Sequence, residues 1–290
     1  MAAPSQIFTT NDGIEGILQL IKAGVVTPIP QQSAAMSTTT RINSEYARVQ
    51  IPIVRGDAGT SWTPEGSVIG ESAPEIDTVE AIPRGLKGIV PLSNEAIKSG
   101  NGDLAGLAIN SLSRDLANQI DKAFYANTTT NGPKGLGSIA ATTVSPTAFD
   151  NLDVFTEAKV TADGLGSVIT SWHVNPVDFL KIAKLKETSG SNRGLLEPDP
   201  QRTNTAVAGQ TFSGFSISGA PLHVSRYVTP GVVWGVPAAT TFTVSSASPE
   251  LVASEDAGFS RDVTMVRATM GVDFAFSDPE GVVKIVLPTT

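Results

Sequence analysis

The side chains that most often perform acid–base or metal chemistry are rare in this chain and follow no catalytic pattern. Histidine occurs only twice, as His173 at the end of an apolar segment and as His223 within a Pro-Leu-His-Val sequence. Neither stands in a motif that supplies a serine or a carboxylate at the spacing that nucleophilic catalysis requires. We interpret both histidines as structural residues and expect no catalytic site.

Motifs for metals, cofactors and phosphate groups are also missing from the sequence. The chain has no cysteine, which excludes disulfides and cysteine-ligated metals. There is no G-x-S-x-G, Walker or H-E-x-x-H sequence, and the aspartates within 256–278 are spaced too widely for a calcium loop. The Gly-Pro-Lys-Gly sequence at 132–135 follows a predicted helix rather than a strand, so we interpret it as a turn. Neither a cofactor nor a metal is expected.

The strongest candidates for a molecular contact lie in an extended segment at residues 51–91. It contains many prolines and glycines and shows no helix or obvious hairpin turn, which is uncommon for so long a segment within a compact domain. It is nevertheless too rich in apolar side chains for a disordered tail. We therefore predict that it is buried on another chain. The candidates for inter-subunit contact are Trp62, Glu65, Ile69, Glu75 and Ile76.

Trp62 has two interpretations, as a core tryptophan or as an exposed residue that binds a neighbouring subunit. The sequence around it is polar, and large aromatic side chains are enriched at the centre of protein interfaces. We favour the contact with a neighbouring subunit.

The composition suits a protein that buries much of its surface against copies of itself. Only 17% of the 290 residues are charged, against about 25% in an average soluble domain. A net charge of −8 and the lack of lysine- or arginine-rich runs argue against a protein that grips DNA. The first residues do not resemble a secretory signal, and no apolar run is long enough to span a membrane. We expect synthesis in the cytosol.

Helical periodicity is strongest over residues 103–126. Its apolar stripe consists of Leu104, Leu107, Ala108, Leu112, Leu116, Ile120 and Phe124. A helix of this length spans about 36 Å and could serve as a structural beam. Shorter helices are expected at residues 12–23, 93–98, 145–163 and 175–189, the last with Asn175 as its N-cap and Pro176 at its first position.

The rest of the chain reads mainly as strands and turns. Residues 25–36 contain two prolines and are expected to be extended or looped. Partial alternation of apolar residues predicts strands within 38–54 and at 86–92. Further strands are predicted at 215–224, 231–236, 240–245, 250–253, 263–276 and 282–287. Helices followed by a run of strands indicate the α+β fold class.

A series of short motifs resembles, in order, the major capsid protein family of tailed bacteriophages. The motifs include Trp62-Thr-Pro-Glu65, Ser72-Ala-Pro-Glu75, Val90-Pro-Leu-Ser-Asn-Glu95, Asp121-Lys-Ala-Phe-Tyr125, Gly132-Pro-Lys-Gly-Leu136, Val174-Asn-Pro176, Ser218-Gly-Ala-Pro-Leu222, Val266-Arg-Ala-Thr-Met-Gly-Val-Asp273 and Asp278-Pro-Glu-Gly-Val-Val-Lys-Ile285. Each motif is short, and their order over residues 60–287 makes the set specific.

The resemblance implies a phage major capsid protein fold, the icosahedral shell fold shared with encapsulins. The implied parts are an N-terminal arm at 1–50, an extended loop at 51–91, a peripheral domain with the long spine helix at 92–150 and 263–290, and an axial domain at 151–262. The sequence departs from the family at Met270-Gly271, where an arginine usually precedes Val-Asp. Residues 55–83 contain no lysine, so we expect no subunit crosslink of the kind that some relatives form there.

The same resemblance implies a structural protein that is not an enzyme. Its copies would self-assemble into pentamers and hexamers that form an icosahedral shell around double-stranded DNA. Its partners would be those copies and separate scaffolding, portal and decoration proteins. It would enclose packaged DNA without sequence-specific binding, and it would not bind a membrane. It would be made in the host cytoplasm and end in the virion capsid.

Three alternatives stay open from the sequence. An encapsulin-like nanocompartment would use the same fold to hold cargo protein instead of DNA. An unrelated α+β enzyme is disfavoured by the lack of a nucleophile–base pair. A secreted adhesin would fit the threonine- and serine-rich C-terminal half but not the absence of a signal sequence.

Overall fold

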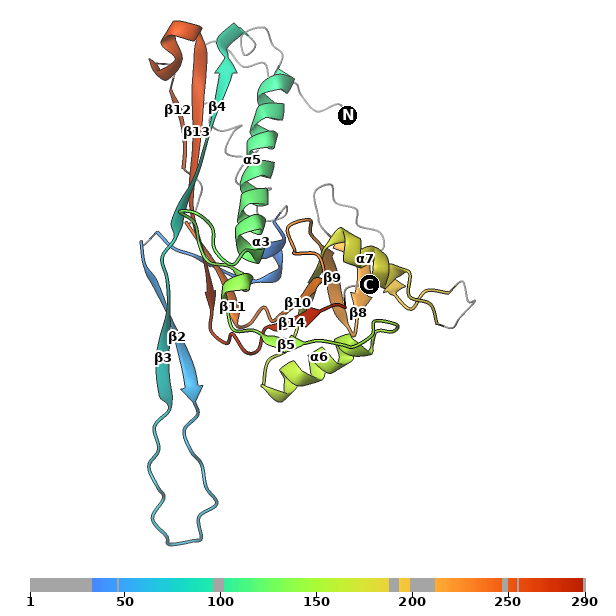
Figure 1. Cartoon of the computed structure of the whole chain (residues 1–290). Coiled ribbons are helices and arrows are strands. Elements are labelled where there is room, and N and C mark those ends of the chain that lie inside the picture. The colour runs from blue at the N-terminus through green and yellow to red at the C-terminus, as the bar shows by residue number, and fades with distance from the viewer. Residues whose placement is uncertain are drawn as a thin grey trace, which may run out of the picture.

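The described part of the chain forms a five-stranded sheet, a seven-stranded sheet, a long helix with several shorter ones, and a projecting two-stranded hairpin (Figure 1). The computed structural model describes residues 33–45, 47–95, 102–187, 193–198, 212–246, 250–254 and 256–288. The helix predicted at residues 12–23 lies outside these ranges, as does the second half of the one predicted at 93–98.

The long helix α5 (Gly102–Tyr125) is the predicted spine helix, and it lies along a sheet of unusually long strands. Strand β13 (Val263–Phe276) pairs antiparallel with β4 (Arg84–Ser93) through ten consecutive residue pairs. The C-terminal half of the predicted stripe, from Leu112 to Phe124, is buried against this pair. A Cβ atom added to Gly88 of β4 would lie 2.7 Å from a methyl group of Leu112, so the helix and strand approach closely there.

Three shorter strands complete this first sheet. Strand β11 (Thr241–Ser245) and strand β12 (Glu250–Ser254) both pair antiparallel with β13. Strand β1 (Thr40–Asn43) adds in parallel to β11. The first sheet therefore unites segments from the beginning, the middle and the end of the chain.

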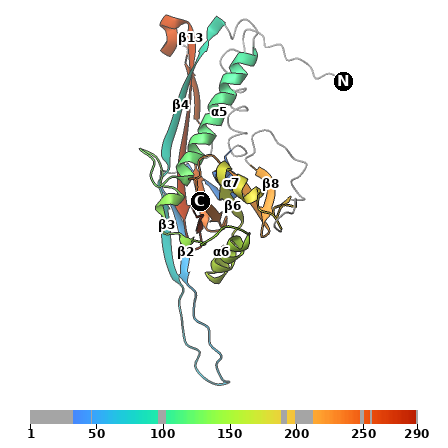
Figure 2. The same ribbon diagram turned by 45° about the vertical axis from the view of Figure 1, so that its right-hand side comes forward.

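The second sheet has seven strands and carries two helices. In spatial order its strands are β5 (Thr142–Val144), β14 (Val283–Val286), β10 (Val232–Val236), β6 (Ser171–Val174), β9 (Ala220–Val224), β8 (Phe212–Ile217) and β7 (Glu197–Pro198). Helix α7 (Pro176–Ala183) lies above these strands and helix α6 (Asp153–Gly164) below them in Figures 1 and 2. Short 3-10 turns occur at η1 (Leu136–Ser138) and η2 (Asp256–Arg261).

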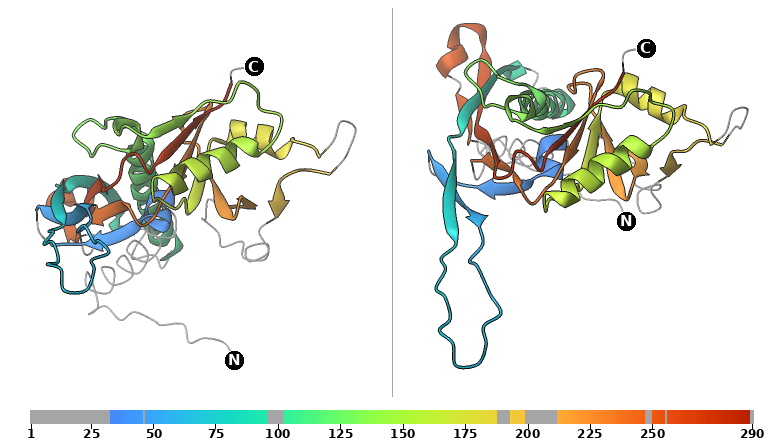
Figure 3. Two further views of the ribbon diagram at one scale, coloured as in Figure 1. Left: turned by 90° about the horizontal axis from the view of Figure 1, so that it is seen from below. Right: turned by 60° about the horizontal axis from the view of Figure 1, so that its bottom comes forward.

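The projecting hairpin consists of β2 (Val49–Gly56), β3 (Glu75–Ala81) and the long connection between them. The segment is extended, as predicted, but the expectation that it lacks local partners was wrong. Its two strands pair antiparallel from Val49 and Ala81 to Gly56 and Glu75, so the backbone groups that face each other find partners locally. Figures 1 and 3 show the hairpin standing clear of the body of the molecule.

Several predicted boundaries shift, each for a local reason. Residues expected to be looped include helix α3 (Ala34–Thr38), which begins because the Ser33 hydroxyl accepts a hydrogen bond from the amide of Met36 at 3.2 Å. The helix predicted from residue 145 begins only at Asp153. The strand predicted at 215–224 is divided in two, because Ser218 and Gly219 adopt positive φ angles of 50° and 80° and form a turn.

The sheets divide the chain differently from the predicted domain boundaries. Strands β11 and β12, predicted with the axial domain, pair with β13 of the first sheet. Strands β5 and β14, predicted with the peripheral domain, belong to the second sheet through the pairing of β14 with β10. Strand pairing joins residues far apart in the chain, and local periodicity carries no signal for the choice of partner.

Candidate functional site

The five predicted contact residues all lie on the projecting hairpin, and all five are exposed. Trp62, Glu65 and Ile69 belong to the connection between the strands, while Glu75 and Ile76 begin β3. Trp62 is fully exposed, so it is not a core tryptophan of its own chain. Two further apolar side chains join this set, Val68 in the connection and Val54 on β2.

The hairpin is held in its extended shape mainly by its own backbone pairing. Val54 and Ile76 are cross-strand partners, so two exposed apolar side chains lie side by side near the connection. The Gly59 amide donates a hydrogen bond to the Ser72 hydroxyl at 2.8 Å across the connection. This arrangement presents apolar groups to the surroundings with no contact to the body, which is a mark of an interaction surface.

An exposed ion pair also crosses the hairpin. The Arg55 Nε and an Asp77 carboxylate oxygen lie 3.2 Å apart. The Thr78 backbone amide, with a smaller effect of Arg55, lowers the pKa of the Asp77 carboxyl. Because both groups face water, the pair stabilises the fold only slightly.

One end of the hairpin is tied to the spine helix by the buried carboxylate of Asp121. Its oxygens accept hydrogen bonds from the Ser33 hydroxyl at 2.7 Å and from the amides of Ala34 and Ala35 at 3.1 and 3.0 Å. Burial raises the pKa of the Asp121 carboxyl, although these hydrogen bonds oppose the shift. Helix α3, which leads through β1 into the hairpin, is thus docked on α5 by this carboxylate and by the burial of Ala35 and Met36 in the same core.

The other end of the hairpin is tied to the first sheet by Asp273 of β13. Its carboxylate accepts a hydrogen bond at 2.6 Å from the amide of Ile82, the residue that follows β3. Burial raises the pKa of this carboxyl as well. Next to it, a Cβ atom added to Gly271 would lie 3.1 Å from Pro83. The departure from the family pattern at this position therefore falls where a side chain would crowd the base of the hairpin.

Neither clamp was identified from the sequence. In the sequence, Asp273 stood out only as one of the aspartates spaced too widely for a calcium loop and as the end of a short motif, and Asp121 only as part of a short motif. A signal for Asp121 did exist, because it stands between the apolar positions Ile120 and Phe124 on the buried side of α5. A carboxylate in such a place needs hydrogen-bond donors from elsewhere.

The two histidines lie inside the molecule and stack on one another. The rings of His173 and His223 are 5.1 Å apart and inclined by 19°. The His173 ring nitrogens lie 2.8 Å from the Tyr125 hydroxyl and 3.0 Å from the Ser171 hydroxyl. Burial lowers the pKa of His173 to about 3. The ring is neutral near pH 7 and links the end of α5 to the second sheet, in keeping with a structural role.

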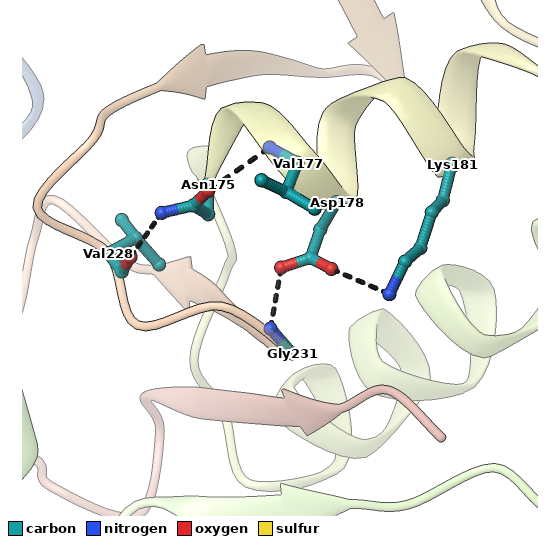
Figure 4. A network of polar contacts seen from close by, with 6 residues as sticks. All are labelled: Asn175, Val177, Asp178, Lys181, Val228 and Gly231. Carbon is teal, nitrogen blue, oxygen red and sulfur yellow. Dashed lines mark hydrogen bonds and ion pairs between the residues drawn. The ribbon is translucent and has the colours of Figure 1, made fainter. Parts of the chain in front are cut away.

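A polar network fixes helix α7 to the second sheet (Figure 4). As predicted, Asn175 caps the helix, accepting a hydrogen bond from the Val177 amide at 3.1 Å, and Pro176 occupies the first turn. The Asn175 amide also donates to the Val228 carbonyl at 2.7 Å. The buried Asp178 accepts from the Gly231 amide at 2.6 Å and pairs with Lys181 at 3.2 Å.

The described residues contain neither a cluster of potential metal ligands nor a helix that could cross a membrane. Within those residues no group of three or more histidine and acidic side chains is placed to hold a metal ion. No helix among the same residues is both long and apolar enough to cross a membrane.

Comparison with known proteins gives one family. The model of the phage capsid family matches residues 16–287, whereas no curated protein sequence matches the chain. The capsid of an empty GTA particle has a similar structure, with a TM-score of 0.68 at 14% identity over 89% of this chain and 90% of that one. A chain from Mycobacterium phage Adephagia is similar with a TM-score of 0.66 and 13% sequence identity, over 90% of this chain and 91% of that one. A chain from Gordonia phage Cozz is similar with a TM-score of 0.65 and 18% sequence identity, over 89% of this chain and 87% of that one.

The Asp121 clamp predicts a specific loss of stability on Asp121→Asn. The amide has only one acceptor oxygen and would turn a donor toward the donors of residues 33–35, leaving buried groups unpaired. We expect the free energy of unfolding of the unassembled chain to fall by about 1–3 kcal/mol, measured by urea denaturation. Asp115→Asn, on the exposed side of the same helix, is the matched control. Equal effects of the two substitutions would contradict the clamp.

The buried His173 predicts a loss of stability in acid. Its pKa is about 3 in the folded chain and about 6.5 when unfolded, so between these values the unfolded state binds more protons. Stability should therefore fall as the pH decreases from about 6.5, by up to about 1.4 kcal/mol per pH unit. The raised pKa values of Asp121 and Asp273 make stability rise as the pH falls. This contribution is the same in the unchanged chain and in the His173→Gln variant, so it cancels when the two are compared. Urea denaturation of His173→Gln should show a shallower pH dependence, and identical profiles would refute this assignment.

Proposed function

The chain belongs to the phage capsid family, and we propose that its copies assemble as pentamers and hexamers into an icosahedral shell around double-stranded DNA. It is a structural major capsid protein of the virion and not an enzyme. The observation that carries the proposal is the projecting hairpin, whose exposed apolar side chains have no partner within their own body.

Burial of these side chains on a neighbouring copy supplies a driving force for assembly. One tryptophan alone removes about 150–250 Å² from water when it is covered. At about 25 cal/mol per Å² this is several kcal/mol before the entropic cost of association. We propose that Trp62, Ile69 and Ile76 fill apolar positions on the neighbour, and that Glu65 and Glu75 lie at the rim of the same contact.

The two sheets take different places in the proposed shell. We assign the first sheet and α5 to the peripheral domain, and the second sheet with α6 and α7 to the axial domain near the symmetry axis of each pentamer or hexamer. The hairpin then reaches over an adjacent copy. The hydrogen bonds of Asp121 to the segment before the hairpin and of Asp273 to the residue after β3 support this assignment. A hairpin that binds a neighbouring copy must keep a fixed orientation relative to its own body.

The charge of the chain suits a container for DNA that does not read its sequence. With a net charge of −8 and few basic residues, the wall offers phosphate groups little attraction, so DNA can move while it is packaged. We propose separate scaffolding, portal and decoration proteins as further partners, and synthesis in the host cytoplasm before assembly. The lack of lysine within residues 55–83 supports a shell without a lysine crosslink in the hairpin.

Electron microscopy and sedimentation of the full-length chain test the proposal directly, with the chain produced alone and together with candidate scaffolding proteins. We expect closed polyhedral particles, with pentamers and hexamers as their subassemblies. Particles from infected cells should contain DNA protected from added nuclease. Particles that hold only protein cargo would show that the chain forms a nanocompartment rather than a virus capsid. A chain that stays monomeric in every preparation would contradict the proposal of a shell.

The hairpin contact predicts an assembly defect for Trp62→Ala without a folding defect. Loss of a central aromatic contact costs about 2 kcal/mol or more per interface, so the protein concentration needed for assembly should rise by roughly tenfold or more. Light scattering measures this concentration, and urea denaturation of the unassembled chain should be unchanged because the side chain is fully exposed. Thr63→Ala, at the next exposed position, is the control, and unimpaired assembly of Trp62→Ala would remove the proposed contact.

A further inference from the structure

Helix α7 carries an exposed apolar pair bordered by positive charge. Val177 and Leu180 have exposed fractions of 57% and 53%, although the same helix is firmly fixed by Asn175 and Asp178 (Figure 4). Lys181 and Lys184 are exposed beside them. We call Val177, Leu180, Lys181 and Lys184 the α7 face.

Helix α6 carries a second apolar surface, bordered by negative charge. Val160 has an exposed fraction of 64%, and Leu165 and Val168 just beyond the helix are exposed as well. The exposed carboxylates on the same side of the helix are Asp153, Glu157 and Asp163. We call Val160, Leu165, Val168 and these three carboxylates the α6 face.

The two faces cannot meet within one copy. The buried sides of both helices belong to the same hydrophobic core, which includes Phe155 of α6 and Ile182 of α7. Both helices pack on the same face of the second sheet, α6 through the contact of Phe155 with Trp172 and α7 through the contact of Phe179 with Phe215 of β8. In Figure 1, α6 lies near β5 and α7 near β8, toward different ends of the sheet. The exposed faces therefore point away from that shared core, toward different ends of the second sheet.

We propose that the α6 face of one copy packs against the α7 face of the next copy, and that this contact repeats around each ring of subunits. The inference rests on the proposed function, which requires rings, and names the surfaces that close them. A contact between two different surfaces of identical copies is head-to-tail and generates a ring when its rotation closes.

Charge selects this pairing over its alternatives. An α6 face against another α6 face would bring six carboxylates together, and two α7 faces would bring lysines together, and both arrangements are repulsive. The α6-to-α7 arrangement places carboxylates against ammonium groups around an apolar centre. Lys181 already pairs with Asp178 of its own chain at 3.2 Å, so Lys184 is the better placed of the two lysines to meet a carboxylate of the neighbour.

Charge reversal on each face tests the contact. The α6 variant is Glu157→Lys with Asp163→Lys, and the α7 variant is Lys184→Glu, which leaves the partner of Asp178 in place. Each alone should raise the concentration for half-maximal assembly by about tenfold or more. All three substitutions in one chain should restore assembly to within about threefold of the unchanged chain. Asp115→Lys, a reversal on the exposed side of α5, controls for net charge, and circular dichroism checks that each unassembled chain is folded.

A mixture of the α6 variant and the α7 variant gives a second and sharper test. Opposite charges meet at every contact only when the two kinds of chain alternate around the ring, and alternation closes only in a ring with an even number of subunits. Equal amounts of the two variants should therefore form hexamers but no pentamers. Native mass spectrometry distinguishes these rings and their composition.

The outcomes separate the inference from the function on which it rests. Failure of the unchanged chain to form rings or shells would overturn the proposed function. Normal assembly of the unchanged chain and of both single-face variants would overturn only the α6-to-α7 contact. Impaired variants that the combined substitutions do not rescue would also overturn it, because they would show that each face binds something other than its counterpart.

Discussion

The antiparallel pairing of β13 with β4 is the contact on which the rest of the described chain depends. β13 also pairs with β11 and β12, and its alternate side chains, from Val266 to Phe274, form one wall of the core under α5. The ring of Phe274 meets that of Phe124 at 5.1 Å, edge to face, near the end of the helix. A long helix resting on two long strands resists bending, because bending would separate a continuous apolar contact.

Rigidity of this unit matters because the hairpin is attached to it at both ends. Asp121 on α5 holds the helix that precedes the hairpin, and Asp273 on β13 holds the residue that follows it. Both carboxylates bind backbone amides, so the position of the main chain is fixed whatever the side chains of those segments are. The hairpin itself has no contact with a core along most of its length. Its base is held by the hydrogen bond to Asp273 and by the packing of Ile51 and Ala81 against Val244 and Ala275 of the first sheet.

The molecule separates the surfaces that fold it from the surfaces that assemble it. Its cores contain small aliphatic residues and a few aromatic rings, buried within a single copy. Apolar side chains on the hairpin and on α6 and α7 are exposed to water in a single copy. Such surfaces contribute nothing to the stability of one copy and gain free energy only on association. A charge content of 17% suits a chain that must tolerate so much contact with its own kind.

The sequence alone determined the elements whose signals are local. The apolar stripe of α5, the Asn175-Pro176 start of α7 and the C-terminal strands were predictable, because each depends on residues a few positions apart. The exposure of Trp62 was also inferred correctly from its polar surroundings. Only the tertiary structure decided which strands pair, that β14 lies beside β10, and that Asp121 receives Ser33 from 88 residues away. These contacts depend on the path of the whole chain, because folding brings together donors and acceptors that are far apart in the sequence. No local sequence pattern indicates which of them will pair.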